Sequence, residues 1–206
     1  MDPRQGLSWL LVGMVAVVTA GAAAIGVEQA PTAAPLTDAV NNTLQASSYN
    51  EVAKETTPQG SETAYLSYQA PDRLGGFVQS GSRRTYIVFI GNYEYQSVTV
   101  AAGASTKHLV FYREAIAGGS AADPAHTYLK LASEGTNHHQ SGNTTKMSIN
   151  EAGQTVDLAF TTSGQYVAQF VGSGEGSSVS LVISQVGNGR PVALPAGAKV
   201  VSIPNG

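Results

Sequence analysis

The sequence of 206 residues contains no cysteine. This absence excludes disulfides, thiolate metal sites, a cysteine nucleophile and a lipobox for N-terminal acylation. Charge is also scarce, because Asp, Glu, Lys and Arg make up only 12% of the chain, about half the usual ~25%. The net charge of −3, from 11 basic and 14 acidic residues, argues against a surface that reads nucleic acid phosphates.

One long hydrophobic run is present, near the start of the chain. Residues 7–27 carry no charge and follow a short segment with Arg4; as a helix, 21 residues extend ~30 Å, enough to cross a bilayer. Two interpretations stay open: a retained transmembrane anchor, or a signal peptide cleaved after an A-x-A site in residues 20–24. A buried core helix is disfavoured, since no polar residue gives the run a second face. Either open interpretation predicts an exported protein.

The rest of the chain divides into a linker and one domain. Residues 28–35 are rich in Pro, Ala and Thr, which is typical of a linker. We therefore expect a signal peptide or anchor over residues 1–27, a linker over 28–35 and an extracytoplasmic domain over 36–206.

Hydrophobic periodicity within the domain predicts mostly strands. Apolar residues every four positions predict a short helix over 38–46, and Asp123 before Pro124 predicts the start of a second one. Alternating residues predict strands over 63–69, 83–90, 93–100 and 107–114, then four more in an antiparallel meander centred on 147–149, 156–160, 166–170 and 179–183. The strand over 83–90 is apolar on both faces, so we expect it to be central. Prolines allow at most an edge strand over 192–194.

This count gives eight to ten strands and two short helices, a mainly β (α+β) domain. Two short helices are too few to cover the apolar face of so large a sheet. The mismatch predicts a sheet that curls onto its own side chains, or a cavity for an apolar ligand.

The sequence contains few candidates for metal-binding or catalytic side chains. His138 and His139 are adjacent, so on an extended segment they point to opposite faces and cannot share a metal ion; we interpret them as part of a polar loop. His108 and His126 are interpreted as solvent-facing, and Ser120, in a glycine-rich stretch, lacks the parallel-sheet context of a nucleophile elbow. We therefore predict no catalytic residues, no metal and no cofactor, and an enzyme is the least favoured function.

A family resemblance appears in residues 65–97, YLSYQAPDRLGGFVQSGSRRTYIVFIGNYEYQS. This stretch resembles the YxAPDR…IGxxxY signature of exported actinobacterial proteins in the lipoprotein-carrier (LolA-like) superfamily, which includes lipid-binding mycobacterial lipoproteins. The ending SLVISQVGNGRPVALP is similar to the terminal strand of that group. The resemblance implies a strongly curved antiparallel sheet, an incomplete β-barrel with two or more short helices on its concave side, here preceded by one N-terminal hydrophobic helix. It also implies carriage or sensing of acylated molecules, although this chain lacks the cysteine that carries the lipid in lipidated relatives.

The function expected from this resemblance is binding of acyl chains in a hydrophobic cavity. Each buried CH₂ contributes ~0.8 kcal/mol, so a sixteen-carbon chain gains on the order of 12 kcal/mol before entropy costs. Expected partners are a lipid or acylated molecule and the membrane through the N-terminal segment, with an envelope protein as a further candidate, but not nucleic acid. The alternative is a signalling or structural interaction domain of the same fold without cargo.

Candidate cavity residues are chosen from the apolar side of each predicted element, and ordinary core packing is the alternative role for each. They are Leu44, Leu66, Tyr68, Val88, Ile90, Val110, Leu131, Phe160 and Phe170.

Overall fold

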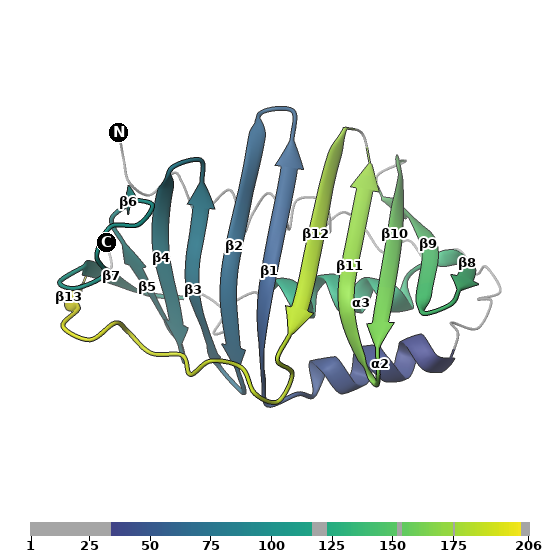
Figure 1. The fold of residues 1–206 in the computed structure, drawn as a ribbon, viewed down its shortest axis with the longest axis horizontal. Helices are drawn as coiled ribbons and strands as arrows, with labels where there is room; N and C mark the ends of the chain where they lie inside the picture. Colours follow the sequence, from purple (N-terminus) through teal and green to yellow (C-terminus); the bar gives the residue numbers. More distant parts are fainter. Residues whose placement is uncertain (1–33, 117–122, 152–153, 175, 203–206) are drawn as a thin grey trace.

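The computed structural model describes residues 34–116, 123–151, 154–174 and 176–202, and these form a mostly β domain (Figure 1). Two short helices, α2 (Ala34–Leu44) and α3 (Pro124–Lys130), are accompanied by the 3₁₀ turn η2 (Leu131–Ser133). The strands are β1 (Ser48–Thr57), β2 (Gly60–Gln69), β3 (Arg73–Ser80), β4 (Arg83–Ile90), β5 (Tyr93–Ser97), β6 (Val100–Ala101), β7 (Val110–Ala115), β8 (Thr136–Ser141), β9 (Thr144–Glu151), β10 (Gln154–Ser163), β11 (Tyr166–Gly174), β12 (Ser177–Ser184) and β13 (Lys199–Ser202).

All described strands belong to one open sheet. Its order is β13-β7-β5-β4-β3-β2-β1-β12-β11-β10-β9-β8, with the short β6 paired to β4. Every pair is antiparallel except β13 with β7, which is parallel. The two ends of the described sheet do not pair with each other, so the barrel is not closed. The expectation of a mainly β protein built on an antiparallel sheet is confirmed.

The inner face of the sheet, defined as the face that contacts the helices, holds the main core. Helix α2 packs chiefly against β10 and β11, and α3 packs chiefly against β12. Thr43 fastens α2 to the sheet, because its buried hydroxyl donates to the Ala39 carbonyl at 2.7 Å and accepts the Val167 N–H at 3.0 Å. Helix α3 starts as the sequence predicts, since the Asp123 side chain accepts from the Ala125 N–H and Pro124 occupies the first turn.

The outer face carries a second, smaller apolar cluster beneath the C-terminal segment. Residues 185–198 leave the end of β12 and run past the ends of β1 to β4 before β13 pairs with β7 (Figure 1). Val192 on this segment packs with Val88, Leu109 and Phe111. Gly75 leaves the space for it, because a Cβ there would lie only 2.9 Å from Val192 Cγ1.

Most predicted elements are present. The helix expected over 38–46 is α2, which begins earlier, at Ala34, within the predicted linker. The strand over 83–90 is β4, which lies inside the sheet with buried residues on both faces. The four-strand meander is β9 to β12.

Two expectations are wrong. The described sheet has thirteen strands instead of eight to ten, because β1, β3 and β8 give no clear alternation. Residues 192–194, where the prolines allow at most an edge strand, form none; Val192 packs in the outer cluster, and the terminal strand lies at 199–202. His138 and His139 lie in edge strand β8 instead of a loop.

The N-terminal segment 1–27 and most of the linker lie outside the described residues. Among the residues that are described, no helix combines the length and the apolar character needed to cross a membrane.

Candidate ligand-binding site

The inner face is a continuous apolar surface that extends well beyond the helices. On β2 to β4 it is formed by buried aliphatic and aromatic side chains, while the main helix contacts are with β10 to β12. The members on β2 to β4 are Ala64, Leu66, Leu74, Val78, Ile87 and Phe89. The backbone of β2 lies very close to Gly76, because a Cβ there would lie 1.9 Å from the Tyr65 carbonyl oxygen. The apolar inner face therefore continues, with buried side chains, along strands that the described helices do not chiefly contact.

Under the helices the same surface is aromatic. Phe160 and Phe170 are fully buried on β10 and β11, with ring centroids 5.0 Å apart. Tyr128 of α3 stacks on Phe170 at 5.0 Å with an interplanar angle of 17°. Such ring pairs add to the stabilisation from area burial alone, so α3 is held to the sheet by aromatic stacking.

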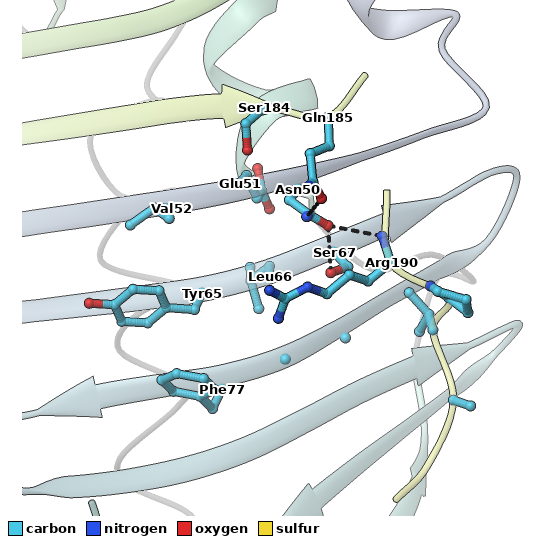
Figure 2. Close-up of a pocket in the computed structure, with 15 residues that line it drawn as sticks. Asn50, Glu51, Val52, Tyr65, Leu66, Ser67, Phe77, Ser184, Gln185 and Arg190 are labelled. Atoms are coloured by element: carbon cyan, nitrogen blue, oxygen red, sulfur yellow. Dashed lines mark hydrogen bonds between the residues drawn. The ribbon is translucent and has the colours of Figure 1, made fainter. Parts of the chain in front are cut away.

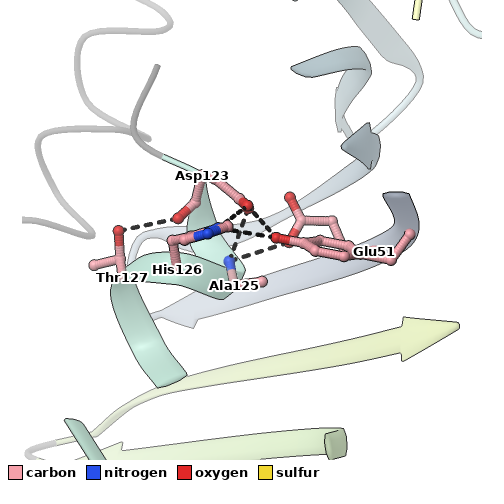
Figure 3. A network of polar contacts seen from close by, with 6 residues as sticks. Glu51, Asp123, Ala125, His126 and Thr127 are labelled. Carbon is pink, nitrogen blue, oxygen red and sulfur yellow. Dashed lines mark hydrogen bonds and ion pairs between the residues drawn. The ribbon is translucent and has the colours of Figure 1, made fainter. Parts of the chain in front are cut away.

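A polar cluster interrupts this apolar surface where α3 meets β1 (Figure 3). The Tyr49 hydroxyl donates to Asp123 Oδ2 and lies 3.1 Å from His126 Nδ1. His126 Nδ1 in turn lies 2.6 Å from Asp123 Oδ2. The Ala125 N–H is shared between Asp123 Oδ1 at 3.0 Å and Glu51 Oε2 at 3.1 Å. These contacts fasten the first turn of α3 to the sheet.

Glu51 is the unusual member, because a carboxyl group is rarely buried this completely. It is only 1% exposed, and its Oε1 has no hydrogen-bond partner among the described residues. Burial, followed by the negative charge of Asp123, raises the pKa of Glu51 well above its ordinary range. Burial raises the pKa of Tyr49 as well, and the charges of Asp123 and Glu51 add to this rise. The cluster therefore favours protonated Glu51 and Tyr49.

The chemical capacity of this cluster is hydrogen bonding at the wall of an apolar surface. Tyr68 extends it, since its ring lies 4.9 Å from the Tyr49 ring and 5.1 Å from the His126 ring. The part of the chain that is described contains no group of three metal-ligating side chains. Ser120, which the sequence places in a glycine-rich stretch, lies outside the described residues.

The sequence analysis did not predict this polar cluster. Tyr49 and Glu51 precede Asp123 and His126 by more than 70 residues, so no local motif joins them. His126, interpreted from sequence as solvent-facing, is half-buried against Asp123, which corrects that interpretation.

The structure brings most of the nine candidate cavity residues to the inner face. Leu66, Phe160 and Phe170 are buried there, Leu131 of η2 belongs to the same cluster, and Leu44 and Tyr68 pack against it. Val88 and Ile90 lie on the outer face, in the cluster around Val192. Val110 is half-buried beside Phe111 and belongs to neither cluster. Since β4 is apolar on both sides, sequence alternation alone does not tell which of its faces is the inner one.

Solved structures of two mycobacterial proteins have a similar fold. LprF from Mycobacterium bovis is 13% identical, with a TM-score of 0.51 over 80% of this chain and 95% of that chain. The lipoprotein LppX of Mycobacterium tuberculosis gives the same identity and TM-score over 80% of this chain and 98% of that chain. The chain has the fold of these mycobacterial proteins. No family model and no curated protein matches the sequence. The resemblance noted in residues 65–97 is thereby confirmed at the level of the fold, and those residues form β2 to β5.

Proposed function

We propose that the protein binds the acyl chains of a lipid or acylated molecule on the inner face of the sheet, outside the cytoplasm, as a carrier or sensor without enzymatic activity. The observation that carries the proposal is the apolar inner surface of β2 to β4, beyond the strands that α2 and α3 chiefly contact. In this proposal the sheet is strongly curved and the helices lie on its concave side.

Three further observations support it. The fold is shared with solved mycobacterial proteins, of which LppX is a lipoprotein. The sequence signature in residues 65–97 resembles a superfamily that handles acylated molecules. The uncharged run over residues 7–27 supports export, by cleavage or by anchoring.

Native mass spectrometry of the full chain, exported in a bacterial host and purified without detergent, tests the proposal. We expect a mass surplus that organic extraction removes as lipid, and uptake of dipalmitoylphosphatidylglycerol by the extracted protein. Bare protein at its calculated mass, with no uptake of the offered lipid, would contradict it.

A matched pair of variants locates the site. Leu66→Trp adds bulk to the inner face, whereas Val182→Trp adds similar bulk at a position 43% exposed on the outer face. We expect uptake to fall about tenfold only in the inner-face variant, with near-ultraviolet circular dichroism showing that both variants fold.

A second candidate function, an interaction domain without cargo, is favoured by the edge of the sheet at β13. Val201 is 47% exposed and pairs with Tyr112 of β7, which is 37% exposed. An edge strand, which is paired on one side only, is suited to contact with another protein when it bears exposed apolar side chains. Site-specific photo-crosslinking from position 201 in the host envelope tests it; one discrete crosslinked product supports the candidate and no product counts against it.

A further inference from the structure

The outer face of the sheet bears three parallel rows of side chains that cross β12, β1, β2, β3 and β4. Residues directly opposite each other in the register define the rows, which together we call the outer platform. The central row is Val182, Val52, Tyr65, Phe77 and Tyr86. The flanking rows are Ser180, Lys54, Thr63, Gln79 and Arg84 on one side, and Ser184, Asn50, Ser67, Gly75 and Val88 on the other.

The central row is apolar and partly open to solvent. Tyr65 is 41% exposed and Val182 is 43% exposed. The Tyr65 and Phe77 rings stack at 4.8 Å, and the Tyr86 ring lies 5.7 Å from Phe77. With strands ~4.8 Å apart, four intervals make this row ~19 Å long.

Apart from Gly75 and Val88, which packs with Val192, the flanking rows are polar and supply hydrogen-bonding groups beside the apolar row. Asn50 organises one of them, since its Oδ1 accepts from the Ser67 hydroxyl at 2.9 Å and from the Arg190 N–H at 3.1 Å. Its Nδ2 donates to the Gln185 side chain. These bonds fix the C-terminal segment beside the platform.

A hollow of about 450 Å³ lies over this polar row (Figure 2). Its lining includes Tyr65, Phe77, the two glycines Gly75 and Gly76, and residues 190–193. Glu51 also contributes to the lining, although its side chain belongs to the inner face. In Figure 2 the Arg190 side chain lies over the sheet between Asn50 and Tyr65. The volume falls in the range of small-molecule sites.

Charge on the platform is of one sign. Lys54 and Arg84 lie in one flanking row, Arg190 lies at the other, and no residue of the three rows is acidic. Within the described residues, neither the Lys54 ammonium nor the Arg190 guanidinium forms an ion pair. The Arg84 guanidinium sits 4.4 Å above the Phe77 ring centroid, which leaves further N–H donors available. Glu51 and Glu55, by contrast, belong to the inner face of β1.

We propose that the outer platform binds an extended glycan that carries acidic groups. A sugar ring has an apolar C–H face and a polar rim of hydroxyls, so a glycan chain matches an apolar row flanked by polar rows. Carboxylate or phosphate substituents on the glycan pair with Lys54, Arg84 and Arg190, because charge-assisted hydrogen bonds are the stronger ones. An acyl chain, by comparison, makes no use of the polar rows.

This site is independent of the proposed acyl-binding surface, which lies on the opposite face. Glycan binding therefore persists in a protein that carries no lipid, and loss of one activity leaves the other in place.

Isothermal titration calorimetry of the full chain with hexagalacturonate, in about 150 mM NaCl to screen long-range attraction, tests the proposal. We expect saturable binding, about tenfold weaker in Tyr65→Ala and in Arg190→Ala. The matched controls Tyr93→Ala and Lys146→Ala remove an exposed tyrosine and a lysine from the same face outside the platform, and we expect them to bind as the wild type does. Lipid uptake of Tyr65→Ala, measured by native mass spectrometry, is expected to equal that of the wild type.

Four outcomes would overturn the proposal. These are absence of binding to hexagalacturonate, equal binding of the uncharged cellohexaose, equal losses in the control variants, and stronger binding to phosphatidylglycerol vesicles than to hexagalacturonate. The last would identify the platform as a surface for anionic membranes.

Discussion

Replacing Glu51 with glutamine will change how stability depends on pH. In Glu51→Gln the side-chain amide oxygen still accepts the Ala125 N–H that Glu51 Oε2 accepts at 3.1 Å, but the amide never ionises. In the wild type, burial and the charge of Asp123 raise the folded-state pKa of Glu51 above its ordinary value of 4.5. The folded state then holds this proton more tightly than the unfolded chain does. Its stabilising contribution is fully present below about pH 4.5 and is lost as the pH rises through the folded-state pKa.

The magnitude follows from the transfer of one proton. Between the two pKa values, the free energy of unfolding of the wild type falls relative to Glu51→Gln by about 1.4 kcal/mol per pH unit. For a chain of this length that corresponds to about 3 to 6 °C in melting temperature per pH unit. We expect Glu51→Gln to be the more stable protein at pH 7, with the difference shrinking steadily toward pH 4.5.

Thermal and urea denaturation of both proteins, in half-unit steps from pH 4 to pH 8, measures the effect. The matched control is Glu134→Gln, which replaces an exposed glutamate after η2. The titratable groups that interact with Glu51 are Asp123, Tyr49 and Tyr128, and they are unchanged in the variant. Parallel pH profiles for wild type and Glu51→Gln would refute the reasoning.

Two more predictions concern packing. Phe170→Ala removes a fully buried ring and should lower the free energy of unfolding, measured in urea, by about 3 to 5 kcal/mol. The control Tyr93→Ala changes a side chain that is 42% exposed and should lower it by less than about 1 kcal/mol. Similar losses in the two variants would contradict this prediction. Gly76→Ala places a Cβ 1.9 Å from the Tyr65 carbonyl oxygen and should cost at least about 3 kcal/mol. Gly174→Ala meets its nearest atom at 3.5 Å and should change stability by less than about 1 kcal/mol, so equal stability of the two alanine variants would show that β3 yields at this position.

The sequence predicts the fold best where neighbours in sequence pair in space. The meander β9 to β12 alternates apolar and polar residues and is joined by short turns, so its strands are visible from local pattern. The start of helix α3 is likewise predictable, because it depends on the adjacent residues Asp123 and Pro124. Strand β1 escaped prediction because its buried side combines Tyr49 and Ala53 with a glutamate. Strand β3 escaped because adjacent glycines at 75 and 76 interrupt its pattern.

The candidate sites were predictable only in part, because both depend on contacts between distant residues. Alternation identifies apolar side chains such as Phe160 and Phe170, and these do face the helices. It does not reveal that Glu51 meets Asp123, since the fold alone brings β1 to α3. The rows of the outer platform exist only once the register of five strands is set, so Tyr65 and Phe77 carry no distinguishing signal in the sequence.

The path of the last residues has a consequence for how the sheet can deform. The segment after β12 starts in the middle of the sheet and ends paired to β7 at one edge, with Arg73 and Gln69 hydrogen-bonded to Val192 along the way. The segment crosses the ends of β1 to β5. Widening this half of the sheet therefore requires these contacts to break together. The half from β12 to β8 has no such crossing within the described residues. If the sheet changes its width to admit molecules of different size, we expect the hinge to lie between β12 and β8. The half that the C-terminal segment crosses is then expected to move as a unit.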